Sequence, residues 1–417
     1  MRPKGKPRVG LFRVLFAAGL AIAILASWVA VDPRSADAFA FPKRLLVEAG
    51  LALAAIAAAG ELRPRRRDPL LWALVAVGLA GFLASGLGSR HPAARDGLMA
   101  AALLALAVPI GASESFSRDR SWWTGLYLAG GALNGVLAVL AGLEIYSPTT
   151  VFGESKRAGL GALVGNSGQL AIALGVAATV AFAVAAGRTG KTRLAAAAAL
   201  AILLAGLFAT QNLTGLFAAA VGASLFAAIR FRRGGRIVLA AAAILVTAVF
   251  LLPAVRSRFA RVAGALRAGD WNSALTARAA PWLAAGGMIR EHPLLGVGPG
   301  AFGAEFVPAR LAAEARGRRR IVLPGLSTAS FSEAHDDYLE ALASIGVPAG
   351  LALIAAFALV MVRAWRAGRA GGPGAMEAAV LAAGAVAAIV WFPLQIPSCA
   401  LAILACAGRA AGARAPS

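Results

Sequence analysis

The chain has 417 residues, of which 59% are hydrophobic and only 14% charged, and its mean hydropathy is +0.75. Soluble globular domains carry roughly 25% charged residues, so this composition excludes a soluble protein and predicts a polytopic membrane protein. The net charge of +22 is explained by basic loops that orient membrane helices, and we expect no nucleic-acid partner. Cys399 and Cys406 lie seven residues apart in the last apolar stretch, which excludes a disulfide framework or a thiolate metal site.

A membrane-spanning helix needs about 20 mainly apolar residues, and this length predicts an all-α protein with about twelve spans. The first of them follows a basic start, as a signal peptide does. Its apolar core exceeds the roughly 7–15 residues of a signal peptide, so we interpret it as an anchor. The predicted limits are 10–31, 44–60, 70–88, 97–113, 122–145, 164–187, 194–210, 213–229, 237–253, 345–362, 376–393 and 396–408.

The basic residues predict the orientation of these spans. If the N-terminus is cytoplasmic, the short cytoplasmic loops carry 22 Lys and Arg residues and the short external loops carry 7. Such an excess marks the cytoplasmic side. Both termini are therefore expected in the cytoplasm, which favours an even number of spans.

One segment, residues 254–344, contains no spanning run and carries eleven arginines. Long loops are translocated regardless of charge, and one long loop among short turns is atypical unless it is functional. The sequence thus predicts three parts, which are residues 1–253 with spans 1–9, an external loop at 254–344, and residues 345–417 with spans 10–12 and a tail. We expect the chemistry in the partly helical external loop.

The first part of this loop predicts a helix from Ala274 to Ile289, with Asn272 or Ser273 as the N-cap. Arg278 and Trp282 would share one face of that helix, because they are four residues apart. The pair could be a surface arginine stacked on an indole or part of a site, and the spacing does not decide between them.

The second part predicts another helix, for which Ser330 and Glu333 have the spacing of a capping box. His335 would then lie in the first turn, where the positive helix end disfavours the imidazolium form. Asp336 and Asp337 act in the opposite direction, so the net shift of the His335 pKa stays open. The two aspartates point apart on a helix, and the other external acids are scattered, so no metal site and no cofactor are expected.

The residues of the loop resemble a known family. The order R...W..A..MIREHPLLGVGPGAF at 278–302, followed by HDDYLEALASIGVPAGLAL at 335–353, is similar to the O-antigen ligase and polymerase superfamily of bacterial polysaccharide assembly. RAGLGALVGNSGQLAIAL at 157–174 also resembles a glycine-asparagine stretch of the family. Many members carry a Ser-Arg pair at an external turn where this chain has Asn212 and Leu213.

The resemblance implies an inner-membrane glycosyltransferase. It would move a glycan from an undecaprenyl-diphosphate carrier to an acceptor hydroxyl, such as that of lipid A-core, at the periplasmic face. The reaction needs a base for the acceptor proton and positive charge for the leaving diphosphate. We expect a metal-independent transfer, because no metal site is evident, and an inverting one, because none of the external acids is an evident nucleophile.

Within this resemblance, His335 is the expected base and Arg278 the expected cation, because arginine binds phosphate through two parallel hydrogen bonds. The expected substrate-binding residues are Arg290, Arg157, Arg256, Trp282 and Asn166. Arg157 and Arg256 are included because the missing family arginine at position 213 requires another cation.

Two alternatives remain open. A polymerase of the same superfamily, which extends a glycan on its own carrier, would use similar loop chemistry. A twelve-span transporter is a different class, but such proteins often consist of two similar halves, whereas the long loop here falls between spans nine and ten.

Overall fold

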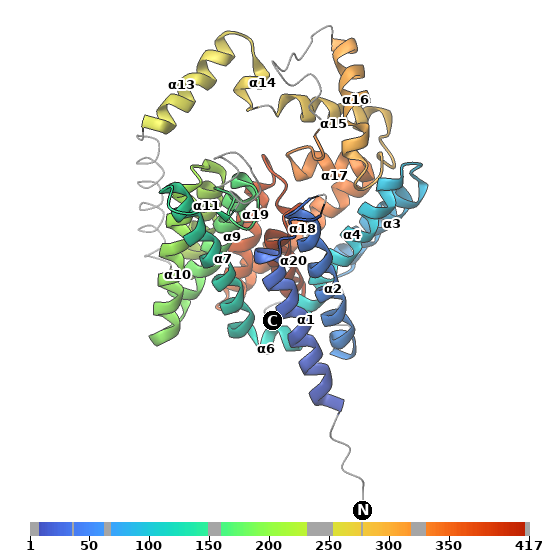
Figure 1. The fold of residues 1–417 in the computed structure, drawn as a ribbon. Coiled ribbons are helices and arrows are strands. Elements are labelled where there is room, and N and C mark those ends of the chain that lie inside the picture. Colours follow the sequence, from blue (N-terminus) through green and yellow to red (C-terminus); the bar gives the residue numbers. More distant parts are fainter. Residues whose placement is uncertain are drawn as a thin grey trace, which may run out of the picture.

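The computed structural model describes residues 8–35, 37–61, 68–148, 160–231, 253–276, 278–317 and 331–412, and within these ranges the chain forms helices and no strand (Figure 1). In chain order the elements are α1 (Arg8–Val29), α2 (Ala40–Ala58), η1 (Ala59–Glu61), α3 (Pro69–Gly88), α4 (Pro92–Ala105), α5 (Ala107–Ala112), α6 (Glu114–Arg118), α7 (Arg120–Gly142), α9 (Ser167–Gly187), α10 (Gly190–Ala209), α11 (Leu213–Arg230), α13 (Pro253–Arg267), α14 (Trp271–Ala274), α15 (Ala279–Glu291), α16 (Phe302–Gly317), α17 (Asp337–Ile345), α18 (Val347–Arg369), α19 (Ala375–Ala387), η3 (Pro393–Gln395) and α20 (Pro397–Gly412).

Eight helices of the described residues are long and apolar enough to cross a membrane, which agrees with a polytopic membrane protein. Every predicted span that falls on described residues coincides with a helix. The predicted span 237–253 lies almost entirely outside the described residues. The eight candidates are Gly10–Val29, Pro69–Gly88, Pro92–Ala112, Arg120–Gly142, Ser167–Gly187, Gly190–Ala209, Leu213–Arg230 and Val347–Arg369.

Three other predicted spans are helices in the structure, but they are not long and apolar enough to be counted among these eight candidates. The helix α2 carries Lys43, Arg44 and Glu48 within its first half, and α19 and α20 have 13 and 16 residues. The predicted span 376–393 extends too far, because α19 already ends at Ala387. We call residues 388–396, which join α19 to α20, the aromatic loop.

The predicted span 97–113 is interrupted at Leu106, which separates α4 from α5. Pro109 accounts for the break. A proline inside a helix has no N–H to donate, and its ring collides with the carbonyl of the residue four positions earlier. That residue is Ala105, the last residue of α4.

The most buried of the candidate spans is α9, in which 14 of the 21 residues are buried. Small residues allow the helices to approach closely, as is typical of membrane bundles. A Cβ atom added to Gly19 of α1 would lie 2.6 Å from the carbonyl oxygen of Gly50 in α2, and the reverse substitution would be equally tight. Substituting either glycine should therefore separate α1 from α2.

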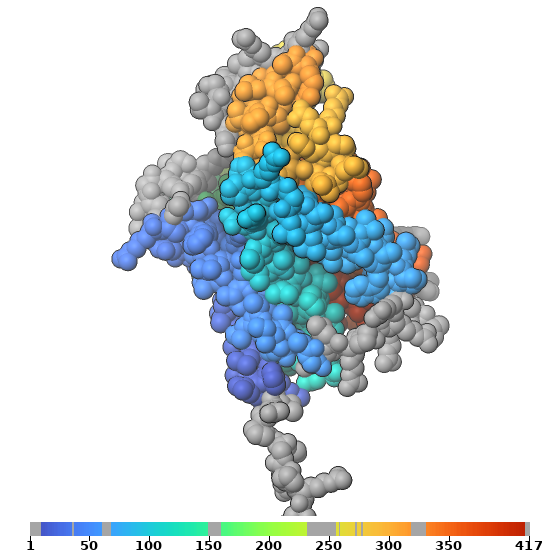
Figure 2. All heavy atoms as spheres, turned by 90° about the vertical axis from the view of Figure 1, so that its right-hand side faces the viewer, coloured from blue at the N-terminus to red at the C-terminus, as the bar shows by residue number. Residues whose placement is uncertain are grey.

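The helices α13 to α16 lie beyond one end of the bundle, and the start of α1 lies at the opposite end (Figure 1). Helices α15, α16 and α17 share a small apolar core of their own, built around Met288, Phe302 and Phe306. The space-filling view shows α15 and α16 above α3 and α4 (Figure 2). None of the helices described between residues 253 and 345 is a candidate span.

Candidate active site

His335 lies in a turn just before α17 and has a left-handed backbone, with φ of +56°. Such a conformation is uncommon for a residue other than glycine. The turn is fixed on both sides. The backbone N–H of Ala334 donates to Glu340 at 2.8 Å, and the side chain of Asp336 accepts from the N–H groups of Tyr338 and Leu339 at 2.9 Å each.

The expected capping box is therefore wrong. The N-cap of α17 is Asp336, and His335 precedes the helix instead of lying in its first turn. Aspartate is among the best N-cap residues, and here it also satisfies two N–H groups of the first turn. Glu333 instead accepts from the hydroxyl of Ser332 at 2.7 Å, while Ser330 is outside the described residues.

The imidazole of His335 is surrounded by aromatic rings. Its centroid lies 5.5 Å from Phe331, 5.6 Å from Trp391 and 5.1 Å from Phe392. Burial lowers the pKa of His335 from 6.5, and the positive charge of Arg278 lowers it further, while the backbone contact with Glu333 opposes the shift. The arrangement favours a neutral imidazole at neutral pH.

The contact of Nδ1 indicates which ring nitrogen of His335 carries the proton. Nδ1 lies 3.3 Å from the carbonyl oxygen of Glu333. A carbonyl only accepts hydrogen bonds, so the contact is favourable when Nδ1 carries the proton. Nε2 then keeps its lone pair and can receive a proton from a substrate.

Arg278 is held at the first residue before α15. Its Nε donates to the carbonyl oxygen of Val390 at 2.9 Å, its Nη1 donates to the hydroxyl of Thr276, and its guanidinium carbon lies 5.6 Å from the centroid of the Trp391 ring. His335 and Arg278 thus contact the same indole from segments 57 residues apart in sequence. The two predicted catalytic residues are brought together around Trp391.

The predicted helix Ala274–Ile289 is two helices in the structure. Asp270 is the N-cap of α14, which ends at Ala274, and α15 begins at Ala279. Pro281 explains the second start, because proline fits the first turn of a helix, where its N–H is not needed. Consequently, Arg278 stacks on Trp391 instead of the predicted partner Trp282.

Two half-buried acids of α17 lie near the aromatic loop, and Asp337 bonds to it directly. A carboxylate oxygen of Asp337 accepts from the N–H of Leu394 at 3.0 Å, and the Asp337 N–H donates to Ala388 at 3.0 Å. Burial raises the pKa of Asp337 to about 7 and that of Glu340 to about 8. These bonds hold Trp391 and Phe392 against His335.

The other predicted residues are distributed differently. Arg290 is exposed near the far end of α15, roughly 18 Å along the helix from Arg278. Arg256 is exposed on α13, so neither arginine joins the Arg278 cluster. Trp282 is half-buried, and its Nε1 has no hydrogen-bond partner. Arg157 lies outside the described residues.

Asn166 is connected to the cluster around Trp391 through the first turn of α9, which it caps. It is the N-cap of α9 and accepts from the N–H groups of Gly168 and Gln169 at 2.8 and 3.2 Å. Gly168 packs against Trp391 so closely that an added Cβ would collide with the indole. The helix end that Asn166 caps therefore supports one side of the Trp391 ring.

Several groups around this cluster were not predicted from the sequence. Trp391, Phe392 and Glu340 were not expected as site residues, although WFPLQIP at 391–397 is a proline-rich connection between two apolar runs. Lys43 was also missed. It is 2% exposed, and its Nζ donates to the carbonyl oxygens of Ala30 and of Leu163 at 2.6 Å each.

At the turn where many family members carry Ser-Arg, Asn212 caps α11 by accepting from the N–H of Thr214 at 2.9 Å. Leu213 begins the helix. Among the described residues, no group of three or more His, Cys, Asp or Glu side chains could hold a metal ion.

Fold and composition thus define a membrane protein that is helical in the part of the chain described, with an aromatic-lined histidine directly before α17. Residues 198–354 match the family model described as O-antigen ligase. The match confirms the resemblance to the O-antigen ligase superfamily, and it includes His335 and Arg278 but ends before Trp391. No curated protein matches the chain.

Proposed function

We propose that the protein transfers a glycan from an undecaprenyl-diphosphate carrier to an acceptor hydroxyl at the periplasmic face of the inner membrane. The observation that carries the proposal is the shared contact of His335 and Arg278 with Trp391. The family match supports an enzyme of the ligase or polymerase type. In this proposal, residues 254–344 are the periplasmic catalytic segment, and both termini are cytoplasmic.

His335 acts as the general base. Its free Nε2 takes the proton of the acceptor hydroxyl while that oxygen bonds to the anomeric carbon of the donor sugar. The bond from the anomeric carbon to the diphosphate oxygen breaks, and the diphosphate leaves with the electron pair. This single displacement inverts the anomeric centre. The lowered pKa of His335 keeps the lone pair available at neutral pH.

Arg278 stabilises the leaving diphosphate. A guanidinium has five N–H bonds, and two of them are used by Val390 and Thr276. The remaining N–H groups are held in a fixed direction before substrate binds, so little reorganisation is needed when charge develops on the diphosphate. Arg278 is half-buried beside the Trp391 ring, and the lower dielectric constant there strengthens this interaction.

The aromatic rings and Asn166 complete the proposed substrate site. Trp391 receives Arg278 on its face and contacts His335, so a substrate bound against this indole would touch both. Arg256, Arg290 and Arg157 are proposed as more distant contacts for the donor or acceptor glycan. Trp282 is proposed as a contact because its Nε1 lacks a protein partner.

The test is glycan transfer by the purified full-length protein with a lipid-linked donor. His335→Ala should abolish transfer and leave membrane insertion normal. His292→Ala is the matched control, because His292 is exposed and belongs to the same segment. Near-normal transfer by His335→Ala would refute the assignment.

Ligase and polymerase activities are separated by the lipopolysaccharide of cells that lack the gene. Loss of all long-chain attachment supports a ligase with lipid A-core as the acceptor. A single capped repeat supports a polymerase.

A further inference from the structure

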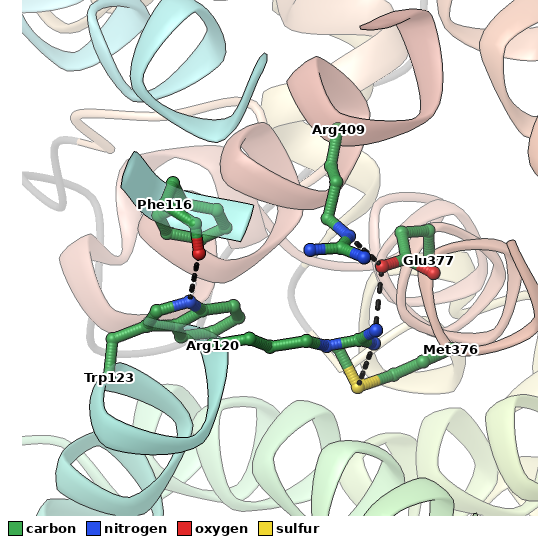
Figure 3. A network of polar contacts seen from close by, with 6 residues as sticks. All are labelled: Phe116, Arg120, Trp123, Met376, Glu377 and Arg409. Carbon is green, nitrogen blue, oxygen red and sulfur yellow. Dashed lines mark hydrogen bonds and ion pairs between the residues drawn. The ribbon is translucent and has the colours of Figure 1, made fainter. Parts of the chain in front are cut away.

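A buried charge cluster lies near the other end of the bundle, far from His335. Glu377 of α19 is 1% exposed, and its Oε1 accepts from Arg409 of α20 at 2.6 Å and from Arg120 of α7 at 3.2 Å. Figure 3 shows both arginines pointing toward this carboxylate, with the sulfur of Met376 beside Arg120 at 3.3 Å. The three side chains carry a net charge of +1.

The distance from the candidate active site follows from α19. Glu377 lies in the first turn of this helix, and the aromatic loop with Trp391 follows its last residue, Ala387. The ten residues from Glu377 to Ala387 rise roughly 15 Å along the helix. The charge cluster is therefore separate from the proposed glycan chemistry.

A cavity of about 140 Å³ adjoins the cluster and is lined by Glu377 and Arg409. The rest of its wall consists mainly of small residues from four helices and a turn, so no large side chain fills it. This volume is several times that of one water molecule. The remaining lining residues are Gly111, Ala112, Ser117, Ala364, Ala367, Pro373, Gly374, Ala410 and Gly412.

Two polar atoms of the cluster have no partner. Oε2 of Glu377 and Nη1 of Arg409 are both buried without a hydrogen bond. A buried charged group without a hydrogen-bond partner lowers the stability of the folded protein. The two atoms require partners of opposite kinds. Nη1 requires an acceptor, and Oε2 requires a donor.

We propose that this cavity binds a phosphate group that has a donor beside it. Both atoms lie behind the cavity wall, so binding requires a small rotation of the Arg409 side chain. A phosphate oxygen would then accept from its Nη1, and an adjacent O–H or N–H would donate to Oε2 of Glu377. The net positive charge of the cluster suits such an anion. Hydrogen phosphate fits this description, and so does a lipid headgroup that combines a phosphate with an ammonium group.

The experiment uses the purified full-length protein and has two arms. In the first, inorganic phosphate is titrated into delipidated protein and binding is measured by calorimetry. In the second, phospholipid phosphorus that stays bound after exhaustive detergent washing is counted per protein by ³¹P NMR. Binding in the first arm identifies a soluble anion, and one retained equivalent in the second arm alone identifies a lipid headgroup.

The variant Arg409→Gln should weaken the phosphate binding at least tenfold, because one charged hydrogen-bond partner is lost. Arg366→Gln is the matched control, since Arg366 is exposed near the end of α18 and outside the cavity. If Arg409→Gln does not fold, Ala112→Leu fills the cavity and leaves both ion pairs intact. It should likewise lose the bound phosphate.

The proposal is overturned if neither arm detects a stoichiometric phosphate, which would mean that the cavity holds water only. It is also overturned if the phosphate persists in Arg409→Gln or, where that variant does not fold, in Ala112→Leu. The test does not involve glycan transfer, so its outcome is independent of the proposed activity.

Discussion

Replacing Arg278 by lysine tests whether the shape of the cation matters as well as its charge. The guanidinium of Arg278 donates to Val390 and Thr276 and lies over the Trp391 ring. Three of its five N–H bonds remain for a phosphate. A lysine ammonium has three N–H bonds in total, so if it keeps both protein contacts, only one remains for the substrate.

The expected loss follows from this difference. Each hydrogen bond to a charged group contributes roughly 1.5–3 kcal/mol, so losing one or two partly replaceable phosphate contacts should raise the activation barrier by about 2–4 kcal/mol. That corresponds to roughly 30- to 1,000-fold in rate. The assay is the single-turnover transfer rate of purified protein at saturating lipid-linked donor, because saturation separates the chemical step from binding.

The matched control is Arg267→Lys, which changes an exposed arginine at the end of α13, in the same segment but with no proposed role. We expect its transfer rate to stay within about twofold of the unmodified protein, since substitutions of exposed residues away from the site usually have small effects. If Arg278→Lys also retains a near-normal transfer rate, the planar shape of the guanidinium does not contribute to that rate. The proposed binding of the diphosphate by Arg278 is then wrong.

Three further predictions concern the metal, a glycine and the half-buried acids. Transfer should persist in EDTA, and loss of activity that a divalent ion restores would contradict a metal-independent reaction. Gly168→Ala should displace the Trp391 ring, because the added Cβ collides with it. This variant should therefore reduce transfer and shift the tryptophan fluorescence. Gly187→Ala, on the same helix with open space around it, should change neither. The raised pKa values of Asp337 and Glu340, about 7 and 8, mean that the folded state retains protons that the unfolded state releases. Their contribution to stability is fully present below the ordinary carboxyl pKa and is lost as pH rises through 7 to 8. The unfolding temperature in detergent should therefore fall from pH 5 to pH 8, and Glu340→Gln should make this fall smaller; an unchanged slope would show that Glu340 does not titrate in this range.

The sequence was sufficient for the helices but not for their ends. Apolar length located a helix at every predicted span among the described residues. Single prolines and caps decided the boundaries. Pro109 divides one predicted span, and Pro281 moves the start of α15 to Ala279. Each effect comes from a single missing N–H, which an average over hydropathy does not detect.

Half of the candidate site could be predicted from the order of motifs along the chain. The resemblance paired His335 with Arg278, and both lie beside one indole in the structure. Trp391 itself was missed. It follows His335 by 56 residues and falls inside the predicted span 376–393, so no local spacing relates the two. Only the packing of α17 against the aromatic loop brings them together.

The structure gives the direction of the His335 pKa shift, which the sequence left open. From sequence, the positive end of a helix and the two neighbouring aspartates act in opposite directions on a residue in the first turn. In the structure, Asp336 takes the first N–H groups of α17, and its negative charge offsets the helix end. Burial among three rings and the charge of Arg278 lower the pKa of His335.

This origin of the pKa shift links the two proposed roles. A cation that binds the leaving diphosphate must lie near the acceptor hydroxyl, and therefore near the base. Its charge then disfavours protonation of that base before the reaction. When the diphosphate binds, its negative charge offsets Arg278, and the imidazole becomes easier to protonate at the stage when it must accept the hydroxyl proton. The contact of both groups with Trp391 thus ties the strength of the base to the presence of the donor, which would limit proton abstraction from an acceptor bound alone.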